Sequence, residues 1–175
     1  MLGSSAQPQQ QVSAVKDKNE VTTTSSPPWD VFLSFRGKDT RPNFISHLHH
    51  ALDQAGIVTF KDDLALSKGE EISTRLRQAI RDSKMFVVVI SKNYADSSWC
   101  LDELVEILSC KRTNNQVIPV FYYVDPSDLR HHKGSFGVAL KKHKKRHSVD
   151  KIDKWKSALT EIAALSGYHL KDAKE

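Results

Sequence analysis

Short apolar runs alternate with amphipathic segments along the chain from residue 29 onward. Four runs are apolar enough to be buried strands, at 31–35, 57–60, 85–90 and 117–124. Other segments carry apolar residues every three or four positions, which predicts helices at 42–55, 72–80, 99–112, 136–147 and 152–165. Strands that are apolar throughout are typical of parallel sheets with helices on both faces. We therefore predict an α/β fold, a flavodoxin-like three-layer sandwich, with a central parallel sheet of about five strands in the order 2-1-3-4-5. The fifth strand is assumed, because the pattern shows four.

This topology predicts where a functional site would lie. In open parallel sheets, ligands bind beyond the carboxyl ends of the strands, where the strand order reverses. Three predicted loops leave those ends, at 36–41, 61–71 and 91–98. We therefore expect the functional residues in these loops and in the helix starts that they feed.

The ends of the chain differ in composition from its middle. Residues 1–28 are rich in Ser, Gln, Thr and Pro and have no aromatic residue, which predicts a disordered N-terminal tail. The domain is expected at 29–170, followed by a short C-terminal tail at 171–175. The longest apolar runs are far shorter than the roughly 20 residues that cross a bilayer, so we expect no membrane span.

Charge and motifs exclude several classes of function. The net charge of +5 is concentrated in Lys141–His147, KKHKKRH, where a solvated helix face is favoured over a nucleic-acid site. Neither GxGxxG nor GxxxxGK[ST] occurs, so the standard nucleotide loops are absent. The His residues lack Cys or acidic partners at metal-ligand spacing, so no metal site is expected. Two thiols too far apart on one helix to pair fit a reducing compartment.

One acidic residue stands out in the helix predicted at 99–112. Besides Glu106, Glu103 has Trp99, Cys100 and Ile107 three or four positions away, so it leans toward the apolar flank of the helix. Asp102 has more polar neighbours. At the end of the first strand, Arg36 offers paired hydrogen bonds to a phosphate, and Gly37 beside it allows close approach to the backbone. From the residues alone, structural roles are favoured for both charged residues: Glu103 as an acid that stabilises a helix start, and Arg36 as a surface residue of a turn.

Four stretches together resemble the plant-type TIR domain of intracellular immune receptors and TIR-only proteins. They are DVFLSFRGKDTR at 30–41, GIVTFKDDLALSKGEE at 56–71, VVVISKNYADSSWCLDEL at 87–104 and IPVFYYVDPSDLR at 118–130. The resemblance implies an enzyme that cleaves the nicotinamide–ribose bond of NAD or NADP, uses no prosthetic group and is activated by self-association. It also implies a cytoplasmic or nuclear role in plant immunity and cell death.

The resemblance also assigns residues. The family's catalytic glutamate lies in its WCLxEL motif, which places that role on Glu103. The NAD-binding positions carry over to Phe35, Arg36, Gly37, Gly69, Ile72 and Trp99. Two self-association surfaces carry over to Ser46 and His47, and to Lys156, Gly167, Tyr168 and His169. Other TIR domains are further possible partners.

Several alternatives stay open at this level. The carboxylate of Glu103 would stabilise an oxocarbenium-like ribose, hold the ribose hydroxyls or form a transient bond to the anomeric carbon. The competing functions are a non-catalytic adaptor that acts by homotypic contacts and, with less support, a nucleic-acid binder using Lys141–His147. The latter segment lacks the interleaved aromatic residues that stack on bases.

Overall fold

The computed structural model of the chain describes residues 28–61, 74–110 and 116–171. Its five strands are β1 (Trp29–Phe35), β2 (Thr59–Lys61), β3 (Ser83–Ile90), β4 (Gln116–Tyr122) and β5 (Tyr168–Leu170). They form one sheet in the order β2-β1-β3-β4-β5, and every neighbouring pair is parallel. The predicted fold class and strand order, including the assumed fifth strand, are therefore confirmed. The predicted tails at 1–28 and 171–175 lie almost entirely outside the described residues.

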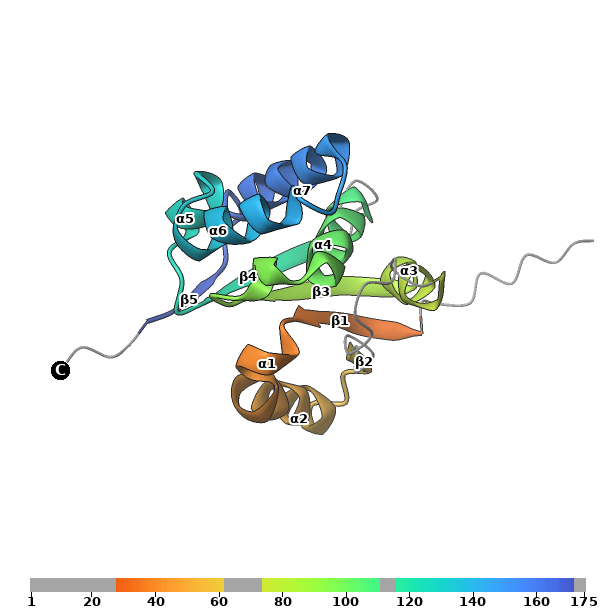
Figure 1. Cartoon of the computed structure of the whole chain (residues 1–175). Helices are drawn as coiled ribbons and strands as arrows, with labels where there is room; N and C mark the ends of the chain where they lie inside the picture. Colours follow the sequence, from red (N-terminus) through yellow and green to blue (C-terminus); the bar gives the residue numbers. More distant parts are fainter. Residues whose placement is uncertain (1–27, 62–73, 111–115, 172–175) are drawn as a thin grey trace, which may run out of the picture.

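Helical segments cover the two faces of the sheet (Figure 1). They are α1 (Gly37–Thr40), the π-helical turn η1 (Arg41–Ile45), α2 (Ser46–Gln54), α3 (Thr74–Arg81), the 3₁₀ turn η2 (Tyr94–Asp96), α4 (Ser98–Cys110), α5 (Pro126–Arg130), α6 (Gly134–His143) and α7 (Val149–Ile162). The segments α1, η1 and α2 lie on one face, and α4 to α7 lie on the other. Among the helices of the described ranges, none combines the length and hydropathy that spanning a bilayer requires.

Each face of the sheet has its own hydrophobic core. Successive side chains of a strand point to opposite faces. In β1, Phe32 therefore joins the larger cluster, formed with α3, α4, α6 and α7, whereas Val31 and Leu33 join the smaller cluster beside α2. Burial of β1 on both faces explains why its sequence is apolar without alternation.

The first helical region begins earlier than its sequence pattern predicts. The predicted start was Pro42, but helical structure starts at Gly37, and Thr40 donates its backbone N–H to the carbonyl of Arg36. Pro42 is tolerated because it lies in the first positions of η1, where its missing N–H costs little. Gly56, with φ of 74°, follows the end of α2 as predicted.

The region after β4 also departs from the prediction. The strand ends at Tyr122 rather than at residue 124, because Tyr123 adopts a positive φ of 53° and donates its backbone N–H to Leu170. The side chain of Asp125 then accepts a hydrogen bond from the backbone N–H of Ser127 and begins the short helix α5, which was predicted as a break only.

Candidate functional site

Glu103 lies on the buried face of α4. Only 2% of its surface is exposed, and the neighbouring buried residues of the helix are apolar. Asp102, the next acid along the chain, instead faces α7, where it pairs with Lys151 at 2.9 Å and accepts a hydrogen bond from Trp155. The neighbours at helical spacing therefore predicted correctly that Glu103 lies on the apolar side of the helix and Asp102 on a more polar side.

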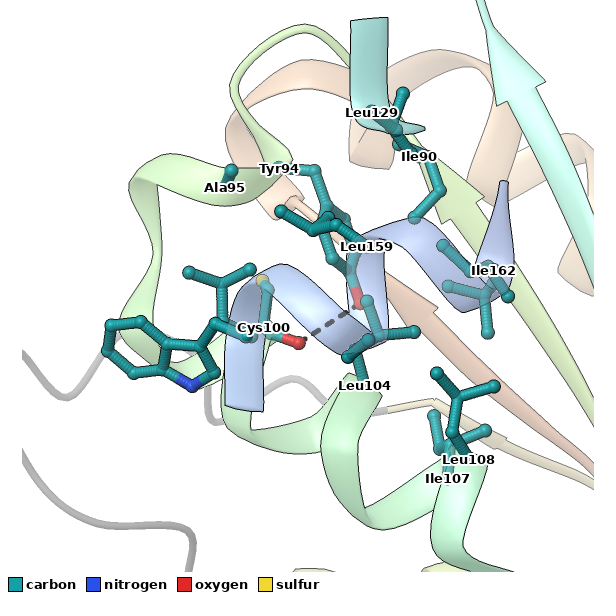
Figure 2. Packing of buried hydrophobic residues seen from close by; sticks show 14 of the residues in the cluster. Ile90, Tyr94, Ala95, Cys100, Leu104, Ile107, Leu108, Leu129, Leu159 and Ile162 are labelled. Atoms are coloured by element: carbon teal, nitrogen blue, oxygen red, sulfur yellow. Dashed lines mark hydrogen bonds between the residues drawn. The ribbon is translucent and has the colours of Figure 1, made fainter. Parts of the chain in front are cut away.

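A chain of hydroxyl groups contacts Glu103. Ser34, the penultimate residue of β1, donates from Oγ to Oε2 of Glu103 at 2.7 Å. Its Oγ also lies 2.9 Å from the hydroxyl of Tyr94, which donates to the carbonyl oxygen of Cys100 at 3.1 Å. Figure 2 shows this last bond, with Tyr94 lying among the side chains of the larger core. Three elements, β1, η2 and α4, are thereby joined by polar contacts inside an apolar region.

Burial governs the chemistry of Tyr94. Desolvation raises the pKa of this fully buried phenol well above its ordinary value, nearby Cys100 and Glu103 raise it further, and the Ser34 hydrogen bond opposes them. Tyr94 therefore keeps its proton at neutral pH and acts as a hydrogen-bond donor.

The turn after β1 is fastened to the turn after β3 by one carboxylate. Asp39 accepts hydrogen bonds from Ser91 Oγ at 2.5 Å, from the backbone N–H of Asn93 at 3.1 Å and from the side-chain amide of Asn93 at 3.1 Å. These two turns follow adjacent strands at the point where the strand order reverses. Asp39 thus fixes the position of the segment that carries Arg36 and Gly37.

Arg36 and Gly37 follow directly from the carboxyl end of β1. The Nε of Arg36 is buried and has no hydrogen-bond partner among the described residues. A side chain at Gly37 would lie 3.1 Å from the guanidinium of Arg41, which itself sits 5.5 Å from the ring centroid of Phe35. Glycine therefore leaves this turn close to the Arg41 side chain without crowding.

Of the other predicted NAD-binding residues, Trp99 and Phe35 lie on opposite faces of the sheet. Trp99, 7% exposed, lies one helical turn before Glu103 and packs in the larger core. Phe35 belongs to the smaller cluster, so its ring points to the face opposite Ser34, while its carbonyl oxygen accepts a contact from Cys100 Sγ at 3.6 Å. Gly69 and Ile72 lie outside the described residues.

No group of three or more His, Cys, Asp or Glu side chains suited to a metal ion occurs within the described ranges. The groups at the carboxyl edge of the sheet include the buried carboxylate of Glu103, its hydroxyl partners and the guanidinium of Arg36, which comes two residues after Ser34. Such a set suits a substrate that develops positive charge near Glu103 and carries anionic groups near Arg36.

A family model described as "TIR domain" matches residues 28–175, which is most of the chain. This chain belongs to the TIR domain family.

Relatives of this TIR domain include plant disease resistance proteins. It is 52% identical over 145 residues to "Disease resistance protein RPV1" of Vitis rotundifolia, and the match covers 82% of this chain and 10% of that protein. It is 48% identical over 151 residues to "TMV resistance protein N" of Nicotiana glutinosa, covering 83% of the chain and 13% of that protein. The chain thus spans little more than a tenth of the length of these relatives.

Among solved structures, the TIR domains in the "activated Roq1 resistosome directly recognizing the pathogen effector XopQ" are similar. The TM-score is 0.74 at 47% identity, and the match covers 83% of this chain and 89% of that one.

The first predicted self-association surface of the TIR domain lies on α2. Ser46 and His47 are both exposed at the start of this helix. The hydroxyl of Ser46 donates to the carbonyl oxygen of Arg41 at 2.6 Å, so it also supports the junction between η1 and α2.

The second predicted surface joins α7 and β5. Lys156 forms an ion pair with Asp153 at 2.8 Å, and 68% of Tyr168 is exposed. His169, exposed in β5, packs its ring 4.9 Å from that of Phe121. Gly167 differs from them, because a side chain there would lie 2.3 Å from the carbonyl oxygen of Pro119 in β4. Internal packing therefore requires glycine at this position, whatever its role in association.

Three residues of the site were missed by sequence reasoning: Ser34, Asp39 and Tyr94. Ser34 did carry a signal, since it is the one polar residue within the apolar run at 31–35.

The basic run at Lys141–His147 is exposed only in part. His143 is buried, and its Nε2 lies 2.9 Å from the carbonyl oxygen of Ala95. Lys141–His147 is therefore not a uniformly solvated face.

Proposed function

We propose that this TIR domain cleaves the nicotinamide–ribose bond of NAD, with Glu103 as the catalytic residue, and that self-association activates it. The observation that carries the proposal is the buried carboxylate of Glu103, held by Ser34 at the carboxyl edge of the sheet where ligands of such folds bind. A carboxylate in an apolar setting interacts strongly with positive charge that develops beside it.

The reaction needs one anion and no acid at the leaving group. The bond between the anomeric carbon and the nicotinamide nitrogen breaks, and its electron pair leaves with nicotinamide, which becomes neutral. The ribose then carries oxocarbenium-like positive charge, which the anionic Glu103 stabilises. Water adds to the anomeric carbon and releases a proton, or a nucleophile within the same molecule adds and closes a ring. Arg36 is the candidate for binding the diphosphate.

Burial of Glu103 bears on activation. The side chain of Glu103 is 2% exposed, so a substrate that arrives from solvent cannot contact it. Contact with NAD therefore requires the surrounding residues to rearrange. We propose that association through the α2 surface and the α7–β5 surface supplies the energy for this change. The similar TIR domains of Roq1 belong to an activated resistosome, which supports assembly as the trigger in this chain and a role in plant immunity.

The proposal is tested by incubating the 175-residue chain with NAD, with and without a crowding agent, and measuring released nicotinamide by chromatography. We expect turnover that rises with protein concentration and is lost in Glu103→Gln. Glu106→Gln is the matched control, since Glu106 lies on the same helix, is partly exposed and pairs with Arg81 at 3.5 Å. Wild-type turnover in folded Glu103→Gln would refute the catalytic assignment.

The adaptor function makes the opposite prediction in the same experiment. An adaptor self-associates through its exposed surfaces but releases no nicotinamide in any assembled form. Sedimentation of the same samples shows whether assemblies formed, so an inactive assembly would favour the adaptor.

A further inference from the structure

We infer that Ser34 and Tyr94 are positioning residues that hold the carboxylate of Glu103 in its reactive orientation, an inference that rests on the proposed NAD-cleaving function. Neither residue needs to touch the substrate. Ser34 acts directly on Glu103, and Tyr94 acts on Ser34.

The direction and burial of the Ser34 contact favour this role. Ser34 is fully buried, and its hydroxyl lies 2.7 Å from Glu103 Oε2, a short distance typical of a hydroxyl that donates to a carboxylate. Glutamate has several rotatable bonds, so a bond to Oε2 from a rigid central strand restricts the carboxylate far more than packing alone.

The place of Ser34 in the sheet favours it as well. The residue pairs with Val88 of β3, and β1 has strands on both sides, so its backbone is fixed. The other residues of β1 whose side chains are buried are apolar. A lone hydroxyl in such a strand would leave a buried polar group that costs stability, unless a partner satisfies it. Glu103 and Tyr94 are those partners.

The hydroxyl chain also accepts either protonation state of Glu103. When the carboxylate is ionised, Ser34 donates to it, and the single O–H of Tyr94 turns to Ser34 Oγ, 2.9 Å away. When the carboxyl carries a proton, it donates to Ser34, Ser34 donates to Tyr94, and Tyr94 donates to Cys100 O. Each O–H of Ser34, Tyr94 and protonated Glu103 has an acceptor in both states, so the geometry survives a proton transfer at Glu103.

The test compares kcat and KM for nicotinamide release by the assembled wild-type chain and its variants. We expect Ser34→Ala to lower kcat by about 10- to 100-fold with KM within about twofold, because misplacing a catalytic group removes transition-state contacts. Tyr94→Phe should lower kcat less. The double variant should be no slower than Ser34→Ala, since Tyr94 acts through Ser34.

Ser83→Ala is the matched control. Ser83 is also buried in the sheet and donates a 2.6 Å hydrogen bond to Ala79 O, but it lies at the amino end of β3, far from Glu103. Its loss should lower the urea midpoint of unfolding without changing kcat. A Ser83→Ala variant that loses as much kcat as Ser34→Ala would reduce the effect to general destabilisation and overturn the inference.

Two further outcomes are decisive. Wild-type kcat in folded Ser34→Ala overturns the inference and leaves the proposed function standing, whereas absence of nicotinamide release by the wild type overturns both. Should Ser34→Ala unfold, Ser34→Cys keeps the shape of the side chain, with a slightly larger atom at its end and only a weak donor. Reduced kcat in Ser34→Cys supports the inference, and unchanged kcat overturns it.

Discussion

Gly167→Ala should destabilise the fold before it affects any interface. The added Cβ would lie 2.3 Å from the carbonyl oxygen of Pro119 and 2.5 Å from its Cγ, both in the neighbouring strand β4. Removing this overlap requires β5 to move away from β4, which strains the pairing of Val120 with Tyr168. Overpacking of this kind costs about 1–3 kcal/mol, and weakened strand hydrogen bonds add about 1 kcal/mol.

The expected loss of about 2–4 kcal/mol is measurable by urea unfolding. With a slope of about 2 kcal/mol per molar urea, the midpoint should fall by roughly 1–2 M. Tyr168→Ala is the control, because its side chain is largely exposed and such substitutions usually change stability by less than about 0.5 kcal/mol. Sedimentation then reports association for both variants.

The two variants separate packing from association. We expect Tyr168→Ala to weaken association while unfolding like the wild type, and Gly167→Ala to lower stability. Gly167→Ala that unfolds at the wild-type urea concentration would show that β4 and β5 absorb the methyl group, and a packing requirement for glycine would then be wrong.

Two further changes test the surroundings of α7. Asp102→Ala removes the acceptor of Trp155 Nε1–H and the partner of Lys151. We therefore expect the free energy of unfolding in urea to fall by about 2–4 kcal/mol, with unchanged turnover per folded molecule. Reduced turnover would contradict the separation of Asp102 from Glu103. Burial, aided by the nearby charges of Lys151 and His143, lowers the pKa of His147 below its ordinary value of 6.5. The unfolded chain therefore gains a proton near pH 6.5 that the folded chain gains only at lower pH, and stability falls on acidification through this window. His147→Asn should flatten that fall, and an unchanged profile of stability between about pH 7 and 5 would count against the assignment.

The central strands were predictable because each is buried on both faces, and the sheet order followed from the fold class. That environment leaves an unbroken apolar run, which is visible in β1, β3 and β4. The edge strand β5 was not visible in the pattern, since its three residues, Tyr168–Leu170, are exposed or half-buried and carry no apolar run. Its existence followed only from the fold class.

The site was predictable in part. The neighbours of Glu103 at helical spacing placed it on a buried face, because that pattern is local to one helix. The partners Ser34 and Tyr94 come from two other elements, and the hydrogen bond between Ser34 and Glu103, 69 residues apart in sequence, exists only after β1 and α4 are packed. Hydrophobic periodicity carries no record of such pairings. The same holds for Asp39, whose hydrogen-bond donors come from the turn after another strand.

Burying Glu103 costs stability, and this cost bears on function. Removing a carboxylate from water is unfavourable, and replacing buried ionic groups by apolar ones of similar size often leaves stability unchanged or raises it. A domain that acts only through exposed contacts on α2 and β5 gains nothing from this arrangement. An active site does, since a carboxylate with its solvent shell replaced by a fixed hydroxyl needs no reorganisation when positive charge develops beside it. Local choices that oppose stability are expected at functional sites, so the burial of Glu103 beside Ser34 supports the catalytic role that we propose for it.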